Sequence, residues 1–391
     1  MKPSEWVSRI AICAALVATP ALAEEATVTI GLILPMTGQQ ASTGKQERAG
    51  AELYIQQHGD TVAGKKISLI LKDDTGAADV TKRLAQELIG NDHASVLMGF
   101  GLTPLALAVA PVATEAKVPE IVTAAATAMI TEKSPYIVRT SFTLPQAATP
   151  MADWCLKNNI KKVVTLVSDY GPGLDAEKWF AQTFTKGGGV VVEEIRVPLK
   201  NPDFAPFLQR VKDDAPDAVF VFVPSGTGSI FMKQFVERGL DKSGIKLIGT
   251  GDVTDDDLLA DIGDSALGAV TTHHYSAAHD SPENKAFVAA FEKANGGLRP
   301  NFMAVGAYDG MALIYQALEK TKGAADGDAL LAAMKGASWM SPRGPVSIDP
   351  QTRDVVQTIY VRKVEKVDGQ LYNVEFASTP AVKDPYKAAK Q

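Results

Sequence analysis

The sequence predicts an α/β protein made of two doubly wound, Rossmann-like lobes that are joined by a hinge of three crossovers. The chain has 391 residues, of which 46% are hydrophobic, and at about 150 residues per domain this length indicates two domains. Short apolar runs alternate with longer amphipathic segments, which is typical of parallel strands connected by helices. No Ser/Gly-rich or Pro-rich linker separates the halves. We therefore expect the chain to cross between the lobes more than once and to leave a cleft at the hinge.

The first 23 residues have the features of a secretory signal peptide. Lys2 and Arg9 precede an apolar run at residues 10–18, and an Ala-Leu-Ala triplet ends at Ala23. Signal peptidase accepts this pattern, so we predict cleavage after Ala23 and a periplasmic mature protein. The apolar run is too short to cross a bilayer. Cys13 lies early in this run rather than at its end, which argues against a lipid anchor.

Cysteine content predicts a fold held by its core. Of the two cysteines only Cys155 remains after cleavage, so no intramolecular disulfide can form. Cys155 lies in an amphipathic helical pattern at residues 151–156, which predicts a buried structural thiol rather than a reactive one.

Charge and motif content argue against nucleic acid, metal and covalent catalysis. The net charge of -6 gives no electrostatic basis for binding a phosphate backbone. The sequence has no Gly-x-Ser-x-Gly, Walker, His-Glu-x-x-His or paired-cysteine motif, so we expect no cofactor and no enzyme activity. His273 and His274 are adjacent in a strand and point to opposite faces, which suits one metal poorly. The acidic run 252–257 is expected to be a helix cap with a solvated first turn.

Strands and helices alternate through the first part of the chain. Residues 28–34 form a β-branched, nearly uncharged run that is too short for a helix, as expected of a parallel strand buried on both faces. The helix that follows, residues 45–58, has apolar positions that include Ala49 and Leu53 and stops at Gly59. The same alternation predicts strands at residues 66–72, 95–99 and 120–123, and helices at 78–88 and 104–115.

A second series of strands and helices begins after Pro145. It predicts strands at residues 162–168, 190–197, 217–223 and 246–249, and helices at 147–157, 174–185, 204–212, 229–238 and 256–262. Later patterns predict helices at 283–294 and 304–320 and strands at 355–361 and 372–376. We assign residues 24–141 with 274–342 to the first lobe, 142–273 with 343–378 to the second, and 379–391 to a C-terminal tail.

Small and hydroxyl residues gather at two loops where strands pass into helices, residues 99–104 and 123–127. Small side chains let a ligand approach the backbone, and free N–H groups at a helix start can hold a carboxylate without a full positive charge. An isolated threonine at such a place usually caps the helix, so capping is the alternative role for Thr103 and for Thr127. Two such loops in register favour a ligand.

A set of short motifs runs through nearly the whole mature chain. They are residues 30–38, Gly44 with residues 50–52, the Asp73-Asp74 strand end, Gly99 with its loop, residues 124–127, Arg139-Thr140, Tyr170-Gly171, Gly249 and residues 307–309. In this order and spacing the chain resembles the solute-binding proteins of ABC importers, of the Leu/Ile/Val-binding type. The resemblance implies the type I periplasmic binding protein fold, a monomer, and a permease of the inner membrane as partner.

The same resemblance assigns roles to individual residues. It implies that the Thr103 and Thr127 side chains, with the Ala125 backbone, hold a ligand carboxylate from the first lobe. Tyr170 would close over the ligand from the second lobe. Phe302 falls where the family has an aromatic wall.

Two departures from the family leave the ligand open. The first loop reads Ala-Ser-Thr-Gly at residues 41–44, where amino-acid-binding members have an aromatic residue, and the acid that pairs the ligand's ammonium is displaced by one place, to Asp252. An unpaired ammonium in a closed cleft costs several kcal/mol, roughly. Either Asp252 reaches it, or the ligand is an aromatic or other small carboxylate, with His274 or Tyr275 available for a ring hydroxyl.

The sequence thus predicts a two-lobed receptor that captures a small carboxylate by hinge closure for a membrane permease. A branched-chain or other hydrophobic amino acid is the first ligand class, and an aromatic acid such as a hydroxybenzoate is the alternative. A ligand sensor remains a rival function. A secreted hydrolase is a second rival, which needs a nucleophile and a base that converge in the cleft.

Overall fold

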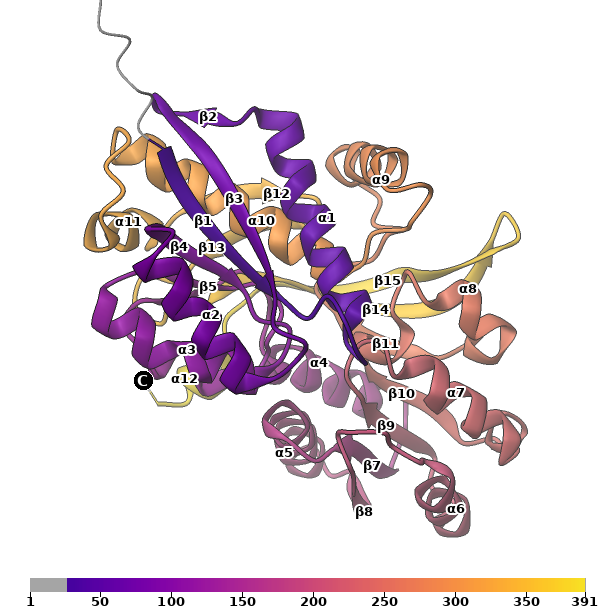
Figure 1. Cartoon of the computed structure of the whole chain (residues 1–391). Helices are drawn as coiled ribbons and strands as arrows, with labels where there is room; N and C mark the ends of the chain where they lie inside the picture. Colours follow the sequence, from indigo (N-terminus) through magenta and orange to yellow (C-terminus); the bar gives the residue numbers. More distant parts are fainter. Residues whose placement is uncertain (1–26, 391) are drawn as a thin grey trace, which may run out of the picture.

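The computed structural model describes residues 27–390 as two sheets, each covered by helices (Figure 1). The predicted signal peptide, its cleavage site after Ala23, and Cys13 lie outside the described residues. None of the helices within residues 27–390 combines the length and the apolar character needed to cross a membrane. The predicted α/β class with two doubly wound lobes is confirmed.

The first sheet has six strands in the order β2-β3-β1-β4-β5-β6. All of its pairings are parallel except that of β2 with β3. Its strands are β1 (Thr27–Leu34), β2 (Thr61–Val62), β3 (Lys65–Asp73), β4 (Ala94–Gly99), β5 (Glu120–Val122) and β6 (Ile137–Arg139). Its helices are α1 (Ala41–His58), α2 (Ala78–Gly90), α3 (Thr103–Ala116), the 3-10 turn η1 (Ala128–Glu132), α10 (Phe302–Lys320) and α11 (Gly327–Met334).

The second sheet has the order β12-β13-β14-β11-β10-β9-β7-β8, and β15 also pairs with β14. Five of its strands, from β8 to β11, are parallel, and the later ones are antiparallel. The strands are β7 (Lys162–Ser168), β8 (Val190–Val197), β9 (Ala218–Phe222), β10 (Lys246–Thr250), β11 (Val270–His273), β12 (Ser338–Ser341), β13 (Gly344–Ile348), β14 (Val355–Val367) and β15 (Gln370–Val382). The helices are α4 (Leu144–Lys157), α5 (Gly171–Lys186), α6 (Ala205–Asp214), α7 (Gly228–Glu237), α8 (Leu259–Ile262) and α12 (Pro385–Ala388), with 3-10 turns η2 (Leu240–Lys242), η3 (Gly251–Thr254) and η4 (Gly263–Ala266). Helix α9 (Pro282–Ala294) packs against α1 and α10 of the first lobe.

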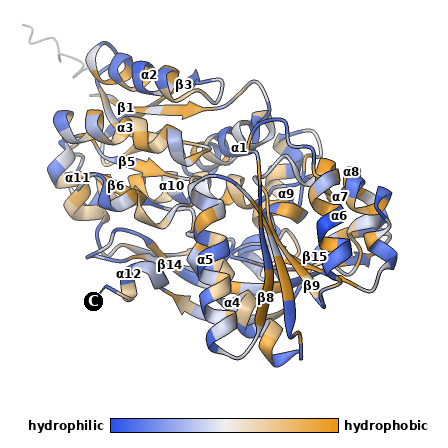
Figure 2. Ribbon diagram, turned by 90° about the horizontal axis from the view of Figure 1, so that it is seen from below, coloured by the Kyte–Doolittle hydropathy of each residue, from blue (hydrophilic) through white to orange (hydrophobic). Residues whose placement is uncertain are grey.

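The central strands are buried on both faces, which explains their unbroken apolar runs. In β1, Ile30 and Leu32 pack into the core that contains α10, whereas Ile33 packs into the core under α2 and α3. Figure 2 shows β1, β5 and β9 as largely hydrophobic, while the helices outside them carry hydrophobic and hydrophilic residues on the same turn. Helices α1 and α10 approach closely at Gly50, where an added Cβ would lie 2.1 Å from the carbonyl oxygen of Ala304.

The chain passes between the sheets at several points. It leaves β6 of the first sheet for α4 beside the second, and it returns after β11 through α9 to α10. Strand β13 and the start of β14 pack into the core of the first lobe through Val346, Ile348 and Val355, although β14 pairs with β11 in the second sheet. We propose crossovers at residues 140–143, 274–281 and 349–354, so that the third lies later than the predicted boundary at residue 342.

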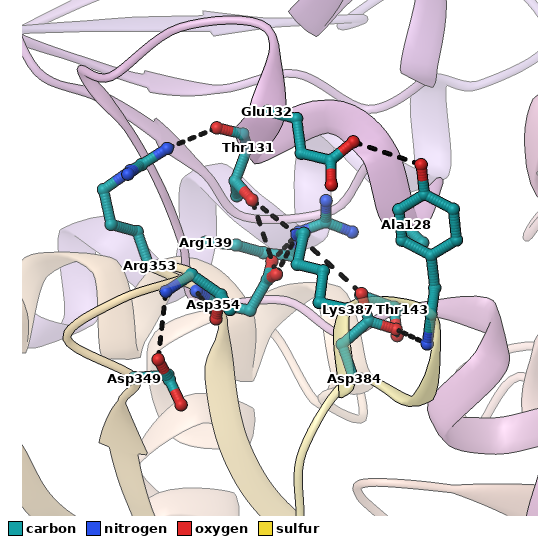
Figure 3. A network of polar contacts seen from close by, with 12 residues as sticks. Ala128, Thr131, Glu132, Arg139, Thr143, Asp349, Arg353, Asp354, Asp384 and Lys387 are labelled. Atoms are coloured by element: carbon teal, nitrogen blue, oxygen red, sulfur yellow. Dashed lines mark hydrogen bonds and ion pairs between the residues drawn. The ribbon is translucent and has the colours of Figure 1, made fainter. Parts of the chain in front are cut away.

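Residues 379–390, assigned to a tail, complete β15 and form α12, which docks beside the first crossover. Figure 3 shows the side chains of Lys387 in α12 and Arg139 in β6 pointing toward Asp354. Asp354 ends the third crossover and directly precedes β14. The Arg139 Nε lies 3.0 Å from Asp354 Oδ1, and Lys387 Nζ forms an ion pair with Asp354 Oδ2. Asp384 accepts a hydrogen bond of 3.0 Å from Thr143, the N-cap of α4. The segment around α12 therefore contacts residues of both lobes at the hinge.

The acidic run at residues 252–257 was expected to form a solvated helix start, and this prediction is wrong. Only Leu259–Ile262 is an α-helix here, and Asp255 and Asp256 are each 2% exposed. Asn373 donates a hydrogen bond of 3.0 Å to Asp256, and the guanidinium of Arg362 lies 3.7 Å from the same carboxylate. These partners come from β14 and β15, more than 100 residues later, and local sequence carries no sign of them.

Cys155 is fully buried in α4, as predicted. Burial raises the pKa of its thiol to about 12. The thiol is therefore protonated and unreactive at neutral pH.

Candidate ligand-binding site

A cavity lies between the lobes, at the carboxyl ends of the parallel strands of both sheets. Its space not filled by atoms is about 320 Å³, a volume that includes the part open to solvent. The residues around it are Gln40, Gly101, Leu102, Thr103, Ala124, Ala125, Ala126, Phe142, Tyr170, Pro172, Phe222, Pro224, Ser225, Asp252 and Met303. They come from both lobes, so a molecule in the cavity contacts both.

The two lobes touch each other around the cavity. Ser42 of α1 donates a hydrogen bond of 2.9 Å to Asp257. On another side, the N–H of Ala128 donates to Asp175 of α5 at 2.8 Å. The structure therefore shows the closed arrangement of the lobes.

Thr103 and Thr127 meet on the wall of the first lobe, where their hydroxyl oxygens are 2.7 Å apart. Thr103 lines the cavity at the first turn of α3, and Thr127 lies directly behind it at the start of η1. Neither side chain caps its helix, since the N-cap of α3 is Leu102 and Thr127 forms no cap hydrogen bond. The alternative role as helix caps is therefore not what the structure shows. The dipole of the fourteen-residue α3 favours an anion here. Of the backbone groups at this helix start, Pro104 has no N–H and the N–H of Leu105 already donates to the carbonyl oxygen of Leu102.

Ala125 lines the cavity as predicted, but its backbone N–H is already used. It donates to the carbonyl oxygen of Phe100 at 3.1 Å. Within residues 27–390, the N–H groups of its neighbours Ala126 and Thr127 have no hydrogen-bond partner. We infer that these two, rather than Ala125, are the backbone donors available to a ligand.

Tyr170 and Asp252 face the cavity from the second lobe. The Tyr170 ring stacks with Phe222, with ring centres 6.1 Å apart and an angle of 25° between the planes. Burial, followed by the charge of Asp252, raises the pKa of the Tyr170 hydroxyl well above its usual value, so this hydroxyl stays protonated and can donate. Asp252 accepts a hydrogen bond of 2.8 Å from Thr250 through Oδ2.

Phe302, His274 and Tyr275 are not among the lining residues; they are buried in the layer behind Phe142 or beside α9. Phe302 meets the Phe142 ring edge-on at 5.7 Å, and His274 packs against Phe142 at 5.0 Å. Tyr275 packs against Phe287 of α9. Phe142 itself, which sequence reasoning missed, supplies this aromatic wall.

The two adjacent histidines are neutral side chains of the core. Burial lowers the pKa of His273 to about 4, and it lowers the pKa of His274 well below its usual value. None of their ring nitrogens has a hydrogen-bond partner among the described residues. Within residues 27–390 no three His, Cys, Asp or Glu side chains are grouped so as to hold a metal ion.

Four of the missed lining residues share one structural position. Gln40 follows the carboxyl end of β1, and Phe222, Pro224 and Ser225 lie at or just after the carboxyl end of β9, as the Thr103 and Tyr170 loops follow β4 and β7. Ligands of open α/β sheets bind at this edge. The signal that could have found them is therefore the end of each predicted strand, and not residue type.

Beneath the ligand-binding loops lies a buried carboxyl group, Glu47 of α1. It is hydrogen-bonded to the hydroxyl of Thr123, which also lies 3.1 Å from the carbonyl oxygen of Gly99. Burial raises the pKa of Glu47 to about 8. When Glu47 is protonated, its carboxyl group donates a hydrogen bond to the hydroxyl oxygen of Thr123. The Thr123 hydroxyl can then donate its own hydrogen to the carbonyl oxygen of Gly99, so both of its contacts are hydrogen bonds.

This arrangement predicts that stability falls as pH rises from about 5 to 8. In the unfolded chain Glu47 ionises near pH 4.5, whereas in the folded protein its carboxyl group stays protonated until about pH 8. Between these two pH values, the free energy of unfolding therefore falls by roughly 1.4 kcal/mol per pH unit because of Glu47. Glu47→Gln should remove this part of the slope in urea unfolding measured at pH 5, 6, 7 and 8. Glu52→Gln, on the exposed face of the same helix, should keep it. Equal slopes for Glu47→Gln and the unmodified protein would contradict a neutral Glu47.

The chain is similar to known proteins in both sequence and structure. A family model described as periplasmic binding protein matches residues 27–370. The Leu/Ile/Val-binding protein homolog 6 of Brucella melitensis biotype 1 is 46% identical over 362 residues, which are 92% of this chain and 93% of that protein.

Two solved structures of ABC transporter solute-binding proteins are similar over almost their whole length. The one from Rhodopseudomonas palustris BisB5, in complex with 3,4-dihydroxybenzoic acid, has 68% sequence identity and a TM-score of 0.91, and the match covers 92% of this chain and 99% of that one. The one from R. palustris HaA2, in complex with p-hydroxybenzoic acid, has 45% identity and a TM-score of 0.90, with 93% and 100% covered. The chain therefore belongs to the periplasmic binding protein family and is the solute-binding protein of an ABC transporter.

Proposed function

We propose that the protein captures a small aromatic carboxylate between its lobes in the periplasm, as a monomer, and delivers it to the permease. The carrying observation is the cavity itself, in which Phe142, Tyr170 and Phe222 form aromatic walls near the Thr103–Thr127 pair. Flat aromatic walls suit a flat ring. Hydroxyl and backbone N–H donors on the first lobe suit its carboxylate.

The solved relatives support the same ligand class. The solute-binding protein that is 68% identical was crystallised with 3,4-dihydroxybenzoic acid, and two others, 45% and 44% identical, were crystallised with 4-hydroxybenzoate. The sequence alone placed hydrophobic amino acids first and aromatic acids second, and these relatives support the aromatic acid.

A hydrophobic amino acid remains the second candidate because Asp252 lines the cavity. Its carboxylate offers a partner for an ammonium group, and curated relatives carry the name Leu/Ile/Val-binding protein. The aromatic walls and the 68% identical relative favour the aromatic acid.

We propose binding without chemical conversion. The lining residues contain no histidine, lysine or cysteine, so Ser225 and Thr103 have no imidazole or amine nearby that would activate them as nucleophiles. A sensor subunit would use the same site, and the operon neighbours of the gene distinguish it from an importer.

A ligand panel tests the proposal. Thermal unfolding of residues 24–391 is measured with 4-hydroxybenzoate, 3,4-dihydroxybenzoate, benzoate, Leu, Ile, Val and Phe. We expect an aromatic acid to stabilise the fold by about 2.7 kcal/mol at a hundredfold excess over its Kd. The bound acid should be recovered unchanged after denaturation. Stabilisation by Leu or Val but by no aromatic acid would refute the proposal in favour of the second candidate.

A further inference from the structure

We infer that Asp252 accepts a hydrogen bond from a ring hydroxyl of the ligand, so that the site selects hydroxylated benzoates over benzoates that lack the hydroxyl. This inference rests on the proposed function and adds the feature of the aromatic acid that the second lobe recognises. Asp252 thereby takes the role that the sequence analysis gave to His274 or Tyr275. Neither of these two side chains lines the cavity.

One of the two carboxylate oxygens of Asp252 has no hydrogen-bond donor among residues 27–390. The Oδ2 of Asp252 accepts from Thr250 at 2.8 Å, whereas no group within residues 27–390 hydrogen-bonds to Oδ1 at the cavity. Asp252 is only 4% exposed. A carboxylate only accepts hydrogen bonds, so a ligand that covers Oδ1 without offering a donor leaves this oxygen unpaired, which is costly.

Within residues 27–390, His273 is the only basic side chain within 4.0 Å of the Asp252 carboxylate. The His273 Nε2 lies 3.7 Å from Oδ2, and the low pKa of about 4 keeps the ring neutral. The guanidinium of Arg362 is used by Tyr275, Thr271 and Asp256. A ligand carboxylate is therefore repelled from this end of the cavity and attracted to the Thr103–Thr127 wall.

The two ends of the cavity, one on each lobe, complement the two ends of a hydroxybenzoate. A benzoate placed with its carboxylate on the first lobe has only C–H groups for the second, which would cover Asp252 without giving it a donor. A ring hydroxyl gives the missing donor. Sites that hydrogen-bond a ligand hydroxyl reject the analogue without it, because their polar group is left unpaired. Since the two ends lie on different lobes, the hydroxyl also links lobe closure to the correct ligand.

The experiment compares 4-hydroxybenzoate with 4-fluorobenzoate, which has a similar size but no hydrogen-bond donor. Isothermal titration calorimetry gives Kd for both ligands with residues 24–391 and with Asp252→Ala. We expect the unmodified protein to prefer 4-hydroxybenzoate by at least about tenfold, and Asp252→Ala to reduce this ratio to about threefold or less. An unchanged ratio in Asp252→Ala, with binding retained, would overturn the inference.

Thr250 gives an independent check of the same carboxylate. Thr250→Val removes the hydroxyl that orients Asp252 while keeping the side-chain volume, so the ratio should fall, and Thr250→Ser should restore it. A purely structural role of Thr250 would weaken both ligands equally and leave the ratio unchanged, which counts against the inference.

The outcomes separate this inference from the proposed function. If neither benzoate binds the unmodified protein but Leu does, both fail, and loss of Leu binding in Asp252→Ala would identify an ammonium partner. If both benzoates bind the unmodified protein equally well, the proposed function stands and the inference alone fails.

Discussion

Arg343→Met is expected to lower the free energy of unfolding by about 3–5 kcal/mol, because it leaves a buried carboxylate without its counter-charge. Arg343 and Asp309 are fully buried, and the guanidinium Nη2 lies 2.7 Å from Asp309 Oδ2. The same guanidinium donates to the carbonyl oxygens of Thr140 and Ser141. It thus joins α10 of the first lobe to the first crossover.

Urea unfolding followed by circular dichroism measures this effect, and a double variant supplies its control. Arg343→Met with Asp309→Leu removes both charges, and replacing a buried ion pair by apolar residues is often neutral or stabilising. The double variant should therefore recover most of the stability lost in Arg343→Met. If Arg343→Met alone costs less than about 1 kcal/mol, the pair has no structural importance at the hinge.

The sequence predicted the strands of the fold well because parallel strands buried on both faces have unbroken apolar runs. Strands β7 and β8 have the predicted bounds, β1 and β4 differ from prediction by one residue at one end, and β3 differs by one residue at each end. Strands β6 and β11 and helix α11 were missed. Their short lengths leave too few residues for a periodic pattern.

The binding loops could be predicted in part, for a related reason. Thr103 was identified because its loop follows a recognisable strand, and Tyr170 was identified through the family resemblance, supported by its place after a strand. Phe142 was missed since it lies at the first crossover, where no strand or helix pattern marks its position. Only tertiary packing puts its ring between the cavity and Phe302.

Long-range charge pairs were out of reach of the sequence. Arg139 and Asp309 both belong to motifs that carried the family resemblance, but nothing local shows that their partners are Asp354 and Arg343. Such pairs depend on how distant segments meet at the crossovers. For this reason the sequence predicted that the chain crosses between the lobes three times, but it did not predict which side chains pair at the crossovers.

Gly171→Val is expected to weaken ligand binding by at least about tenfold while leaving the fold intact. Gly171 begins α5 on the second lobe and faces Thr127 on the first; a Cβ at this position would lie 2.6 Å from the Thr127 hydroxyl oxygen. That oxygen cannot easily move, because it is hydrogen-bonded to Thr103. A valine therefore holds the lobes apart, and apparent affinity falls in proportion to the fraction of molecules that can close.

Calorimetry and small-angle X-ray scattering together test this prediction with the ligand that stabilises the unmodified protein. Gly171→Val should show the weaker Kd and little or no ligand-induced decrease in radius of gyration. Gly90→Val is the matched control, since Gly90 ends α2 where an added Cβ meets no atom within 4 Å, and it should bind and compact normally. Full affinity and normal compaction in Gly171→Val would show that the close approach of Gly171 to Thr127 does not limit closure of the lobes. The absence of a side chain at position 171 would then have no role in ligand binding.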